Sequence, residues 1–367
     1  MRVRFHIIPY TLRFKFEAGT SRGSFTEKET WFIQAFKTNE ESVFGMGEAS
    51  PLKGLSIDYS DHYLTDLNTF LNGIQESDIP ETEEAILEFI AQHIPAAFPS
   101  IRFGLETALL DLINGGKRII FNNSFCKGQL RIPINGLVWM GDQEFMSAQI
   151  EEKLKAGFDT IKMKVGAISF DEEFALLSSI RDRYSANEIT LRVDANGAFD
   201  ESNVYYRLEQ LASLDIHSIE QPVKPGQFGL MHELCQSEIL PIALDEELIG
   251  ANELEEKKEL LNEIKPQYII LKPSLTGGIK STAEWIKTAE SMNIGWWMTS
   301  MLESNVGLNA IAQFTAQFDE LLPQGLGTGQ LYHNNIDSPL EIRKGELLYN
   351  SPKSWNYNLL GLRGYTR

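Results

Sequence analysis

Charged residues stand at the ends of five consecutive short apolar runs in the middle of the chain. In order they are Lys164, Asp194, Glu220, Asp245 and Lys272. A single charged residue in such a place usually begins a loop or caps the next helix. Five in succession indicate a shared position, because the carboxyl ends of parallel strands meet at one face of a barrel, where catalytic side chains gather. The sequence therefore predicts one cluster of lysines and acids.

The three acids of this cluster favour a metal site. Asp194, Glu220 and Asp245 would repel one another in a partly buried cleft, and a divalent cation relieves this repulsion. Mg2+ takes about six oxygen ligands, and the lack of a histidine or cysteine among these residues disfavours zinc. Asn196 follows Asp194 by two residues, so it would lie on the same side and support a ligand or contact the substrate. We predict a Mg2+ site in which Mn2+ can substitute.

The lysines favour proton transfer. Lys162 and Lys164 are two residues apart, so both side chains face the same side of a strand. Neighbouring ammonium groups and burial lower a lysine pKa, and a neutral lysine can act as a base. We expect Lys162 to balance the acids and Lys164, nearer the barrel mouth, to move a proton. Lys272 would approach from the opposite wall as a second acid or base, or as a fixed cation.

Together, the lysines and the metal indicate one class of reaction, the removal of a proton from the carbon next to a carboxylate. This removal places a second negative charge on the carboxylate, and a metal ion with a nearby cation stabilises that charge. The pairing of a lysine base with Mg2+ on such an ene-diolate is a known arrangement of enolase-type sites. The expected partner is therefore a small-molecule carboxylate substrate.

The elements that must position these residues follow a repeated pattern. Eight short apolar runs, each followed by a helix-length amphipathic stretch, lie at residues 133–140, 160–165, 189–193, 218–219, 241–244, 268–271, 295–299 and 322–325. Such repeated βα units close naturally into a barrel of the (β/α)8 type. An open doubly wound sheet would give the same local pattern, but no G-x-G-x-x-G follows a first strand.

The rest of the chain predicts a second unit of α+β type. Residues 2–16 and 30–37 alternate as strands do, with a loop at 18–23, and helical patterns follow at 61–74, 81–93 and 103–112. We therefore divide the chain into an α+β capping domain at 1–128 and a barrel at 129–335. The tail at 336–367 is expected to return and complete the capping domain.

Composition excludes some partners. The 33 basic and 51 acidic residues give a formal charge of −18, which argues against a nucleic-acid partner. No run of about eighteen apolar residues is present, so no membrane span is expected. The two cysteines, Cys126 and Cys235, fit a reducing compartment, and the location expected is cytoplasmic. Whether the chain forms a homo-oligomer is left open by the sequence.

The ordered set of motifs resembles the enolase superfamily, and within it the muconate-lactonising-enzyme subgroup. The matching pieces are Lys162-x-Lys164, Asp194-x-Asn196, Glu220-Gln221-Pro222, Asp245-Glu246 and Lys272-Pro273. The resemblance implies an α/β fold with a modified (β/α)7β barrel of TIM type, capped by an α+β domain made from both ends of the chain. It also implies that Lys164, and not Lys272, is the base.

Within that subgroup the segments 135–142 and 155–162 are similar to the o-succinylbenzoate synthase family. The resemblance implies a metal-dependent lyase of menaquinone biosynthesis. Its reaction would be the syn-dehydration of 2-succinyl-6-hydroxy-2,4-cyclohexadiene-1-carboxylate to 2-succinylbenzoate through an enolate. The alternative is an N-succinylamino acid racemase or dipeptide epimerase that uses Lys164 and Lys272 as two bases. Dipeptide epimerases usually carry Asp-x-Asp after the eighth strand, and residues 325–330 contain no acid.

Three further residues are candidates for substrate binding. Arg22, in the first loop, could hold a substrate carboxylate from the cap. Ser300 and Glu303 follow the seventh apolar run and resemble positions that line the active sites of the family.

Overall fold

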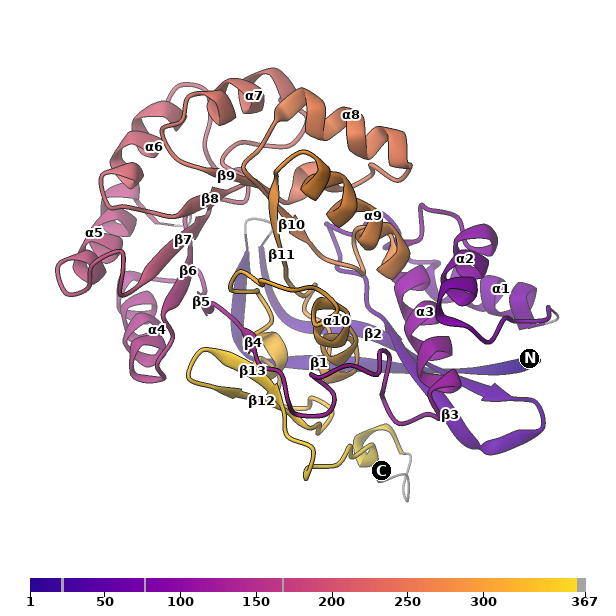
Figure 1. Cartoon of the computed structure of the whole chain (residues 1–367). Coiled ribbons are helices and arrows are strands. Elements are labelled where there is room, and N and C mark those ends of the chain that lie inside the picture. Colours follow the sequence, from indigo (N-terminus) through magenta and orange to yellow (C-terminus); the bar gives the residue numbers. More distant parts are fainter. Residues whose placement is uncertain (21–22, 76, 167, 362–367) are drawn as a thin grey trace.

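A three-stranded antiparallel sheet opens the computed structural model, which describes residues 1–20, 23–75, 77–166 and 168–361. Its strands are β1 (Val3–Thr20), β2 (Gly23–Lys37) and β3 (Glu40–Ala49) (Figure 1). The hairpin of β1 and β2 extends further than the alternation of apolar residues predicts, since polar residues such as Ser24 and Glu27 pair in it without an apolar signal. The predicted loop at 18–23 is therefore wrong in its bounds.

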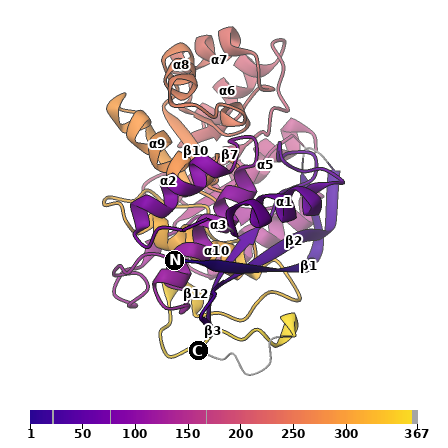
Figure 2. The same ribbon diagram turned by 90° about the vertical axis from the view of Figure 1, so that its right-hand side faces the viewer.

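Three helices cover one face of this sheet. They are α1 (Tyr63–Gln75), α2 (Glu83–His93) and α3 (Pro99–Ile113), and Figure 2 shows α1 and α3 near β1 and β2, with α2 beyond them. Trp31, Ile33 and Ala35 alternate along β2 and join the same apolar core as the helices. The backbone of α3 comes so close to β3 that a Cβ at Gly47 would lie 1.9 Å from the carbonyl oxygen of Gly104. Only a glycine permits this contact.

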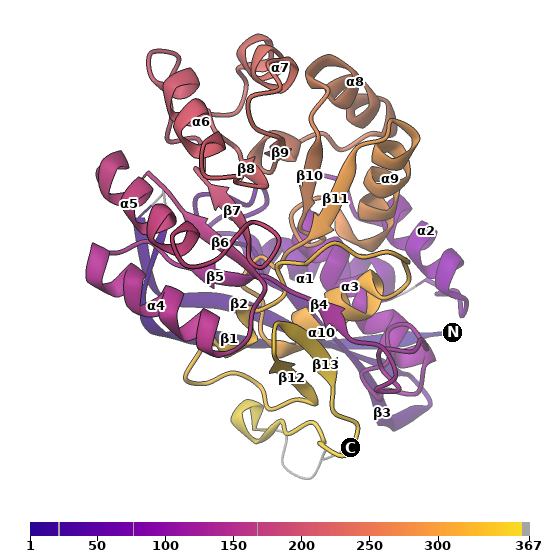
Figure 3. The same cartoon turned by 60° about the vertical axis from the view of Figure 1, so that its left-hand side comes forward.

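Seven parallel strands form the curved sheet of the barrel, in the spatial order β11-β10-β9-β8-β7-β6-β5. Helices lie outside the strands and alternate with them along the chain (Figure 3). The strands are β5 (Gly136–Val138), β6 (Thr160–Lys164), β7 (Thr190–Asp194), β8 (Ser218–Glu220), β9 (Ile242–Leu244), β10 (Tyr268–Leu271) and β11 (Gly295–Met298). The helices are α4 (Gln143–Lys155), α5 (Phe170–Arg181), α6 (Val204–Ala212), α7 (Phe228–Gln236), α8 (Leu254–Ile264), α9 (Gly278–Ser291) and α10 (Asn305–Thr315), with the short turns η1 (Glu246–Leu248), η2 (Thr328–Gln330) and η3 (Asn358–Leu360).

The eighth predicted run closes the barrel with very few contacts. Gln324 bridges Ile134 just before β5, and Gly325 bridges Thr299 just after β11, both in parallel orientation. Seven strand–helix units followed by this final segment give the (β/α)7β arrangement, as predicted. None of the helices described is both long and apolar enough to cross a membrane.

The C-terminal residues return to the N-terminal sheet. Strand β12 (Leu340–Arg343) pairs with β13 (Glu346–Tyr349), and β13 pairs with β4 (Ile132–Pro133). Beyond them, Trp355 and Tyr357 pack with Phe32 on the face of β2 that the helices leave uncovered. Both faces of β2 are thereby buried.

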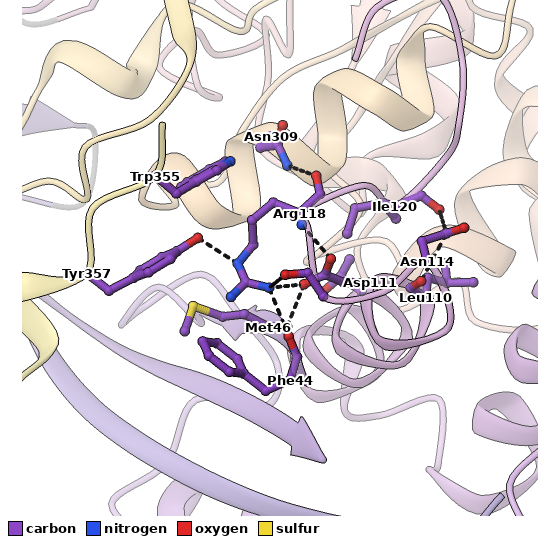
Figure 4. Close-up of polar contacts among 12 residues, drawn as sticks. Phe44, Met46, Leu110, Asp111, Asn114, Arg118, Ile120, Asn309, Trp355 and Tyr357 are labelled. Carbon is purple, nitrogen blue, oxygen red and sulfur yellow. Dashed lines mark hydrogen bonds and ion pairs between the residues drawn. The ribbon is translucent and has the colours of Figure 1, made fainter. Parts of the chain in front are cut away.

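A buried arginine joins this tail to the cap (Figure 4). Arg118 forms an ion pair with Asp111 of α3 and donates from Nε to the hydroxyl of Tyr357 at 2.6 Å. Its guanidinium lies 4.6 Å from the ring centroid of Phe44 in β3. The tail thus contacts the cap, while the domain bounds at 1–128 and 129–335 and the assignment of 336–367 to the capping domain stay predictions.

Candidate active site

The predicted cluster lies at the carboxyl ends of neighbouring barrel strands. In the register of the sheet, Lys164 of β6 pairs with Asp194 of β7, and Asp194 pairs with Glu220 of β8. Asp245 follows β9 and Lys272 follows β10 directly. Five charged side chains therefore reach one mouth of the barrel from five consecutive strands.

Lys162 is held between two carboxylates. Its Nζ lies 3.0 Å from Asp194 Oδ2 and 2.5 Å from Glu220 Oε2. Burial alone would lower the pKa of Lys162, but the charges of Asp194 and Glu220 outweigh it and raise the pKa above its ordinary value. Lys162 is a fixed cation.

Lys164 lies nearer the mouth and has different partners. Its Nζ donates to Asn196 Oδ1 at 2.6 Å and to Asp194 Oδ2 at 3.1 Å. The amide of Asn196 in turn donates to Glu246 Oε1 at 3.1 Å. Asn196 thereby orients Lys164, and Glu246 orients Asn196.

Lys272 reaches the same mouth from the other side and forms an ion pair with Asp245. Burial lowers its pKa, but the carboxylates of Asp245 and Glu220 raise it by more, so the net shift is upward. The pKa of Glu220 rises to about 8, first because the carboxyl is buried and then because Asp194 is close.

The carboxylates of Asp194, Glu220 and Asp245 form ion pairs with lysines and do not contact one another as a group. Among the described residues, no three Asp, Glu, His or Cys side chains form a group ready to hold a metal ion. The donor set nevertheless fits a hard divalent cation, because the three acids at successive strand ends offer only oxygen. One of these oxygens, Glu220 Oε1, is buried without a hydrogen-bond partner in the described part of the chain. An oxygen atom of this kind is suited to bind a metal ion.

A small pocket of about 90 Å3 contains both lysines proposed for proton transfer. Its polar lining includes Lys162, Lys164, Asp194, Asn196, Glu220, Glu246, Lys272 and Ser300. Apolar side chains cover it from the cap and from the loop after β11, namely Phe25, Leu52, Leu55, Met301 and Leu302. An ionisable site under an apolar cover keeps bulk water away from a charged intermediate.

Asp245 and Glu303 are placed differently from the other candidates. Asp245 is buried and does not line the pocket, whereas its neighbour Glu246 does. Glu303 is fully buried and accepts hydrogen bonds from Ser274 Oγ and from the backbone of Met301. Ser274 follows Lys272 by two residues, so Glu303 holds the loops after β10 and β11 together from behind the site.

Ser300 lies in the pocket wall, where its hydroxyl is 2.5 Å from Thr328 Oγ1. Arg22, the remaining candidate, lies outside the described residues.

Arg192 is a residue that sequence reasoning missed. It is 2% exposed and lies in the barrel interior next to Lys162 in the strand register, with its guanidinium 3.9 Å from the ring of Trp297. Burial lowers its pKa to about 10. The signal was available, because Arg192 precedes Asp194 by two residues and therefore shares its face of β7.

Comparison of the sequence with known proteins leads to the same family of metal-dependent enzymes as the geometry of the site. The family described as "Enolase C-terminal domain-like" matches residues 146–352. The o-succinylbenzoate synthase of Desulfotalea psychrophila is 43% identical over 92% of this chain and 96% of its own. The chain belongs to the enolase superfamily. Enzymes of this superfamily depend on a divalent metal ion, which agrees with the donor set described above.

The solved structures agree with this assignment. The crystal structure of MenC from Desulfotalea psychrophila superposes with a TM-score of 0.84 at 40% identity, covering 95% of this chain and 100% of the other. The muconate lactonizing enzyme from Pseudomonas putida shares the fold, with a TM-score of 0.79 at 20% identity over 99% of both chains. By contrast, the L-Ala-D/L-Glu epimerase of Francisella tularensis subsp. novicida is 34% identical over 45% of this chain and 46% of its own.

Proposed function

We propose that this superfamily member is an o-succinylbenzoate synthase. The observation that carries the proposal is the pocket in which Lys164 and Lys272 stand with Asp194 and Glu220 under an apolar cover. The 43% identity with a synthase over nearly the whole chain supports the same reaction. The enzyme would be a lyase that removes water from 2-succinyl-6-hydroxy-2,4-cyclohexadiene-1-carboxylate.

The metal of this proposal is Mg2+, with Mn2+ as a substitute, held by Asp194, Glu220 and Asp245. All three offer carboxylate oxygen, which both ions accept. When bound, the ion supplies positive charge beside the ring carboxylate whose α-carbon loses its proton.

Lys164 is the proposed base. It would take the proton from C1 of the ring, the carbon that carries the carboxylate, and leave an enolate. The protonated Lys164 would then give that proton to the hydroxyl on C6, on the same face, so that the C6–O bond breaks and water departs. The new C1–C6 double bond makes the ring aromatic, and the product is 2-succinylbenzoate.

Lys272 and Lys162 act as cations in this scheme. Both carry carboxylate partners that raise their pKa values, so both keep their charge near neutral pH. Lys272 lines the pocket and can stabilise the enolate directly, whereas Lys162 offsets the charges of Asp194 and Glu220.

A racemase or epimerase with Lys164 and Lys272 as two bases is the second candidate. It is favoured by the fact that both lysines line one pocket. Residues 325–330 offer no acid to an ammonium group, which disfavours a dipeptide epimerase but leaves an N-succinylamino acid racemase open. The raised pKa of Lys272 disfavours both, because a second base must lose its proton. The racemase and epimerase relatives that match most of the chain are also less similar to it, at 24–29% identity against 43% for the synthase.

The proposal carries over three expectations from the sequence. These are a cytoplasmic location, a domain boundary near residue 128, and an enzyme without a nucleic-acid partner, consistent with its charge of −18.

The test is turnover. The purified chain with Mg2+ is mixed with 2-succinyl-6-hydroxy-2,4-cyclohexadiene-1-carboxylate, and loss of the cyclohexadiene is followed by absorbance. Turnover should fall by at least about a thousandfold in Lys164→Ala, because the proton transfer loses its base. An exposed lysine, Lys127→Ala, is the matched control and should react like the parent. If metal-loaded parent enzyme leaves the substrate unchanged, the synthase proposal fails, and α-proton exchange in D2O with N-succinylamino acids becomes the next assay.

A further inference from the structure

A second and larger cavity, of about 620 Å3, adjoins the catalytic pocket. It lies between β5 with α4 on one side and residues 325–331 on the other. Among the described residues, only the Ile134–Gln324 bridge pairs the first strand region with the closing segment. Above this bridge the barrel wall is open, and the cavity fills the opening. We call it the side chamber, lined by residues that include Lys15, Asn135, Leu137, Trp139, Lys153, Thr328 and Lys344.

The side chamber and the catalytic pocket adjoin each other. Five residues line both of them, namely Leu137, Trp139, Lys162, Thr299 and Thr328. Pockets for small molecules typically measure about 300–1,000 Å3. The catalytic pocket, at about 90 Å3, holds less than the whole proposed substrate, so part of the molecule must extend beyond it. The side chamber offers the room.

The lining of the side chamber suits an aliphatic chain that ends in a carboxylate. Phe16, Leu137, Trp139 and Phe158 provide apolar walls. Besides Lys162, which is paired with Asp194 and Glu220, three lysines line the chamber, namely Lys15, Lys153 and Lys344. The one acid in the lining is Glu152, which lies 3.0 Å from Lys153. The local charge is therefore positive, in a chain whose formal charge is −18.

A buried amide also points to a ligand. Asn135 is 3% exposed, lines the side chamber, and has an Oδ1 atom without a hydrogen-bond partner in the described part of the chain. Buried polar atoms without a partner are uncommon in folded proteins. An amide can present either its oxygen or its NH2 to a ligand, depending on its rotation.

We propose that the side chamber binds the succinyl arm of the substrate. The ring then stays in the catalytic pocket with its carboxylate toward Lys164 and the acids, and the arm passes Leu137 and Trp139. Its terminal carboxylate meets a lysine of the chamber wall, either Lys15 near the carboxyl end of β5 or the pair Lys153 and Lys344 near its amino end, while Asn135 hydrogen-bonds the arm. This inference rests on the proposed function and adds the residues that select the substrate.

The test compares two ligands that differ only at the end of the arm. In 2-butanoylbenzoate a methyl group replaces the terminal carboxylate of 2-succinylbenzoate. Their dissociation constants for the Mg2+-loaded chain are measured by isothermal titration calorimetry. The parent should bind 2-succinylbenzoate about tenfold more tightly or better, since each partly exposed ion pair contributes up to a few-fold in affinity. The triple variant Lys15→Gln, Lys153→Gln, Lys344→Gln should bind the two ligands alike, and Lys127→Gln should keep the preference.

A steric variant provides an independent check. A Cβ at Gly327 would have only ordinary contacts, the nearest being Asn135 O at 3.6 Å and Ile134 Cδ1 at 3.8 Å, so Gly327→Leu fills the side chamber without a backbone clash. This variant should bind 2-succinylbenzoate about tenfold less tightly than the parent does. The affinity for 2-acetylbenzoate, which has a shorter arm, should fall less.

Equal affinity of the parent for 2-succinylbenzoate and 2-butanoylbenzoate would overturn the side-chamber proposal. So would a triple variant that keeps the full preference. Neither result depends on turnover, so the failure of this inference and the failure of the synthase proposal are separately visible.

Discussion

At the scale of single residues, cations and carboxylates share the mouth of the barrel in alternation. Lys162 lies between Asp194 and Glu220, and Lys272 lies on Asp245. Even so, the pKa of Glu220 stays raised to about 8, since burial and Asp194 outweigh the lysines. The site therefore favours additional positive charge, which a divalent ion would supply.

This charge deficit predicts stabilisation by metal. Mg2+ binds the folded chain and should raise its melting temperature, with a gain of about 2.7 kcal/mol when the ion is at one hundred times its dissociation constant. Glu220→Gln keeps the shape of the side chain but removes its charge. The Mg2+ concentration at half-maximal shift should then rise by about tenfold or more.

Differential scanning fluorimetry over a Mg2+ series measures both effects, and EDTA should reverse the shift. Glu209→Gln on the exposed face of α6 is the control. A Glu220→Gln variant with the Mg2+ response of the parent would remove Glu220 from the ligand set.

The identity of the charged cluster could be predicted because each member ends an apolar run, and strand ends converge. Three features could not be predicted with the same ease. The raised pKa of Lys162 depends on distances to two acids from other strands. The placement of Glu246 in the pocket in place of Asp245 depends on the turn η1 after β9, and that of Glu303 on hydrogen bonds to Ser274 and Met301.

At the scale of elements, one carboxyl joins the cap to the barrel. Glu106 of α3 accepts hydrogen bonds from the first backbone amides of α9, at 2.5 Å from Ile279 N and 3.4 Å from Lys280 N. Burial raises its pKa to about 8, despite these bonds. The helix that leads into the barrel is thus fixed to the helix that follows the Lys272 loop.

A pH dependence of stability follows from Glu106. The unfolded chain loses this proton near the ordinary value of 4.5, whereas the folded chain keeps it to about pH 8. Between these values the unfolded state binds fewer protons, so the free energy of unfolding should fall as pH rises, by at most about 1.4 kcal/mol per unit. Above pH 8 the fall should stop.

Glu106→Gln should flatten this dependence, because the variant has no proton to lose there. Urea unfolding at a series of pH values from 5 to 9 measures it, with Glu84→Gln on the exposed start of α2 as the control. Parallel curves for parent and Glu106→Gln would assign the pH dependence to other groups.

The elements themselves were largely predictable. Seven apolar runs are strands in the structure because burial on both sides of a parallel strand requires continuous apolar sequence. Within the described part of the chain, the eighth run, 322–325, bridges its neighbours only at Gln324 and Gly325, a contact that no periodicity encodes.

At the scale of the whole molecule, the two ends of the chain share one buried cluster. Arg118, Asp111 and Phe44 belong to the N-terminal part, and Tyr357 comes from the tail (Figure 4). The sequence suggested that the tail returns to the cap. It could not name the contact, because 239 residues separate Arg118 from Tyr357 and no spacing rule joins them.

Removing one hydroxyl should destabilise this cluster. Tyr357→Phe leaves the Nε–H of a buried guanidinium without its acceptor, which typically costs about 1–3 kcal/mol. Equilibrium unfolding in urea measures the loss, and Tyr206→Phe, at a side chain that is 60% exposed, should leave stability unchanged. Equal stability of Tyr357→Phe and parent would show that the tail does not hold the cap through this bond.

The return of the tail also has a consequence for biosynthesis. The strands of the cap leave the ribosome first, yet the face of β2 that carries Phe32 is fully covered only when Trp355 and Tyr357 join Val306 and Ile336 on it. At roughly 5–20 residues per second, the 239 residues between Arg118 and Tyr357 take on the order of 10–50 s to translate. During that time Phe32 and Phe44 are an exposed apolar surface on a nascent chain, and a chaperone that binds such surfaces has its opportunity there.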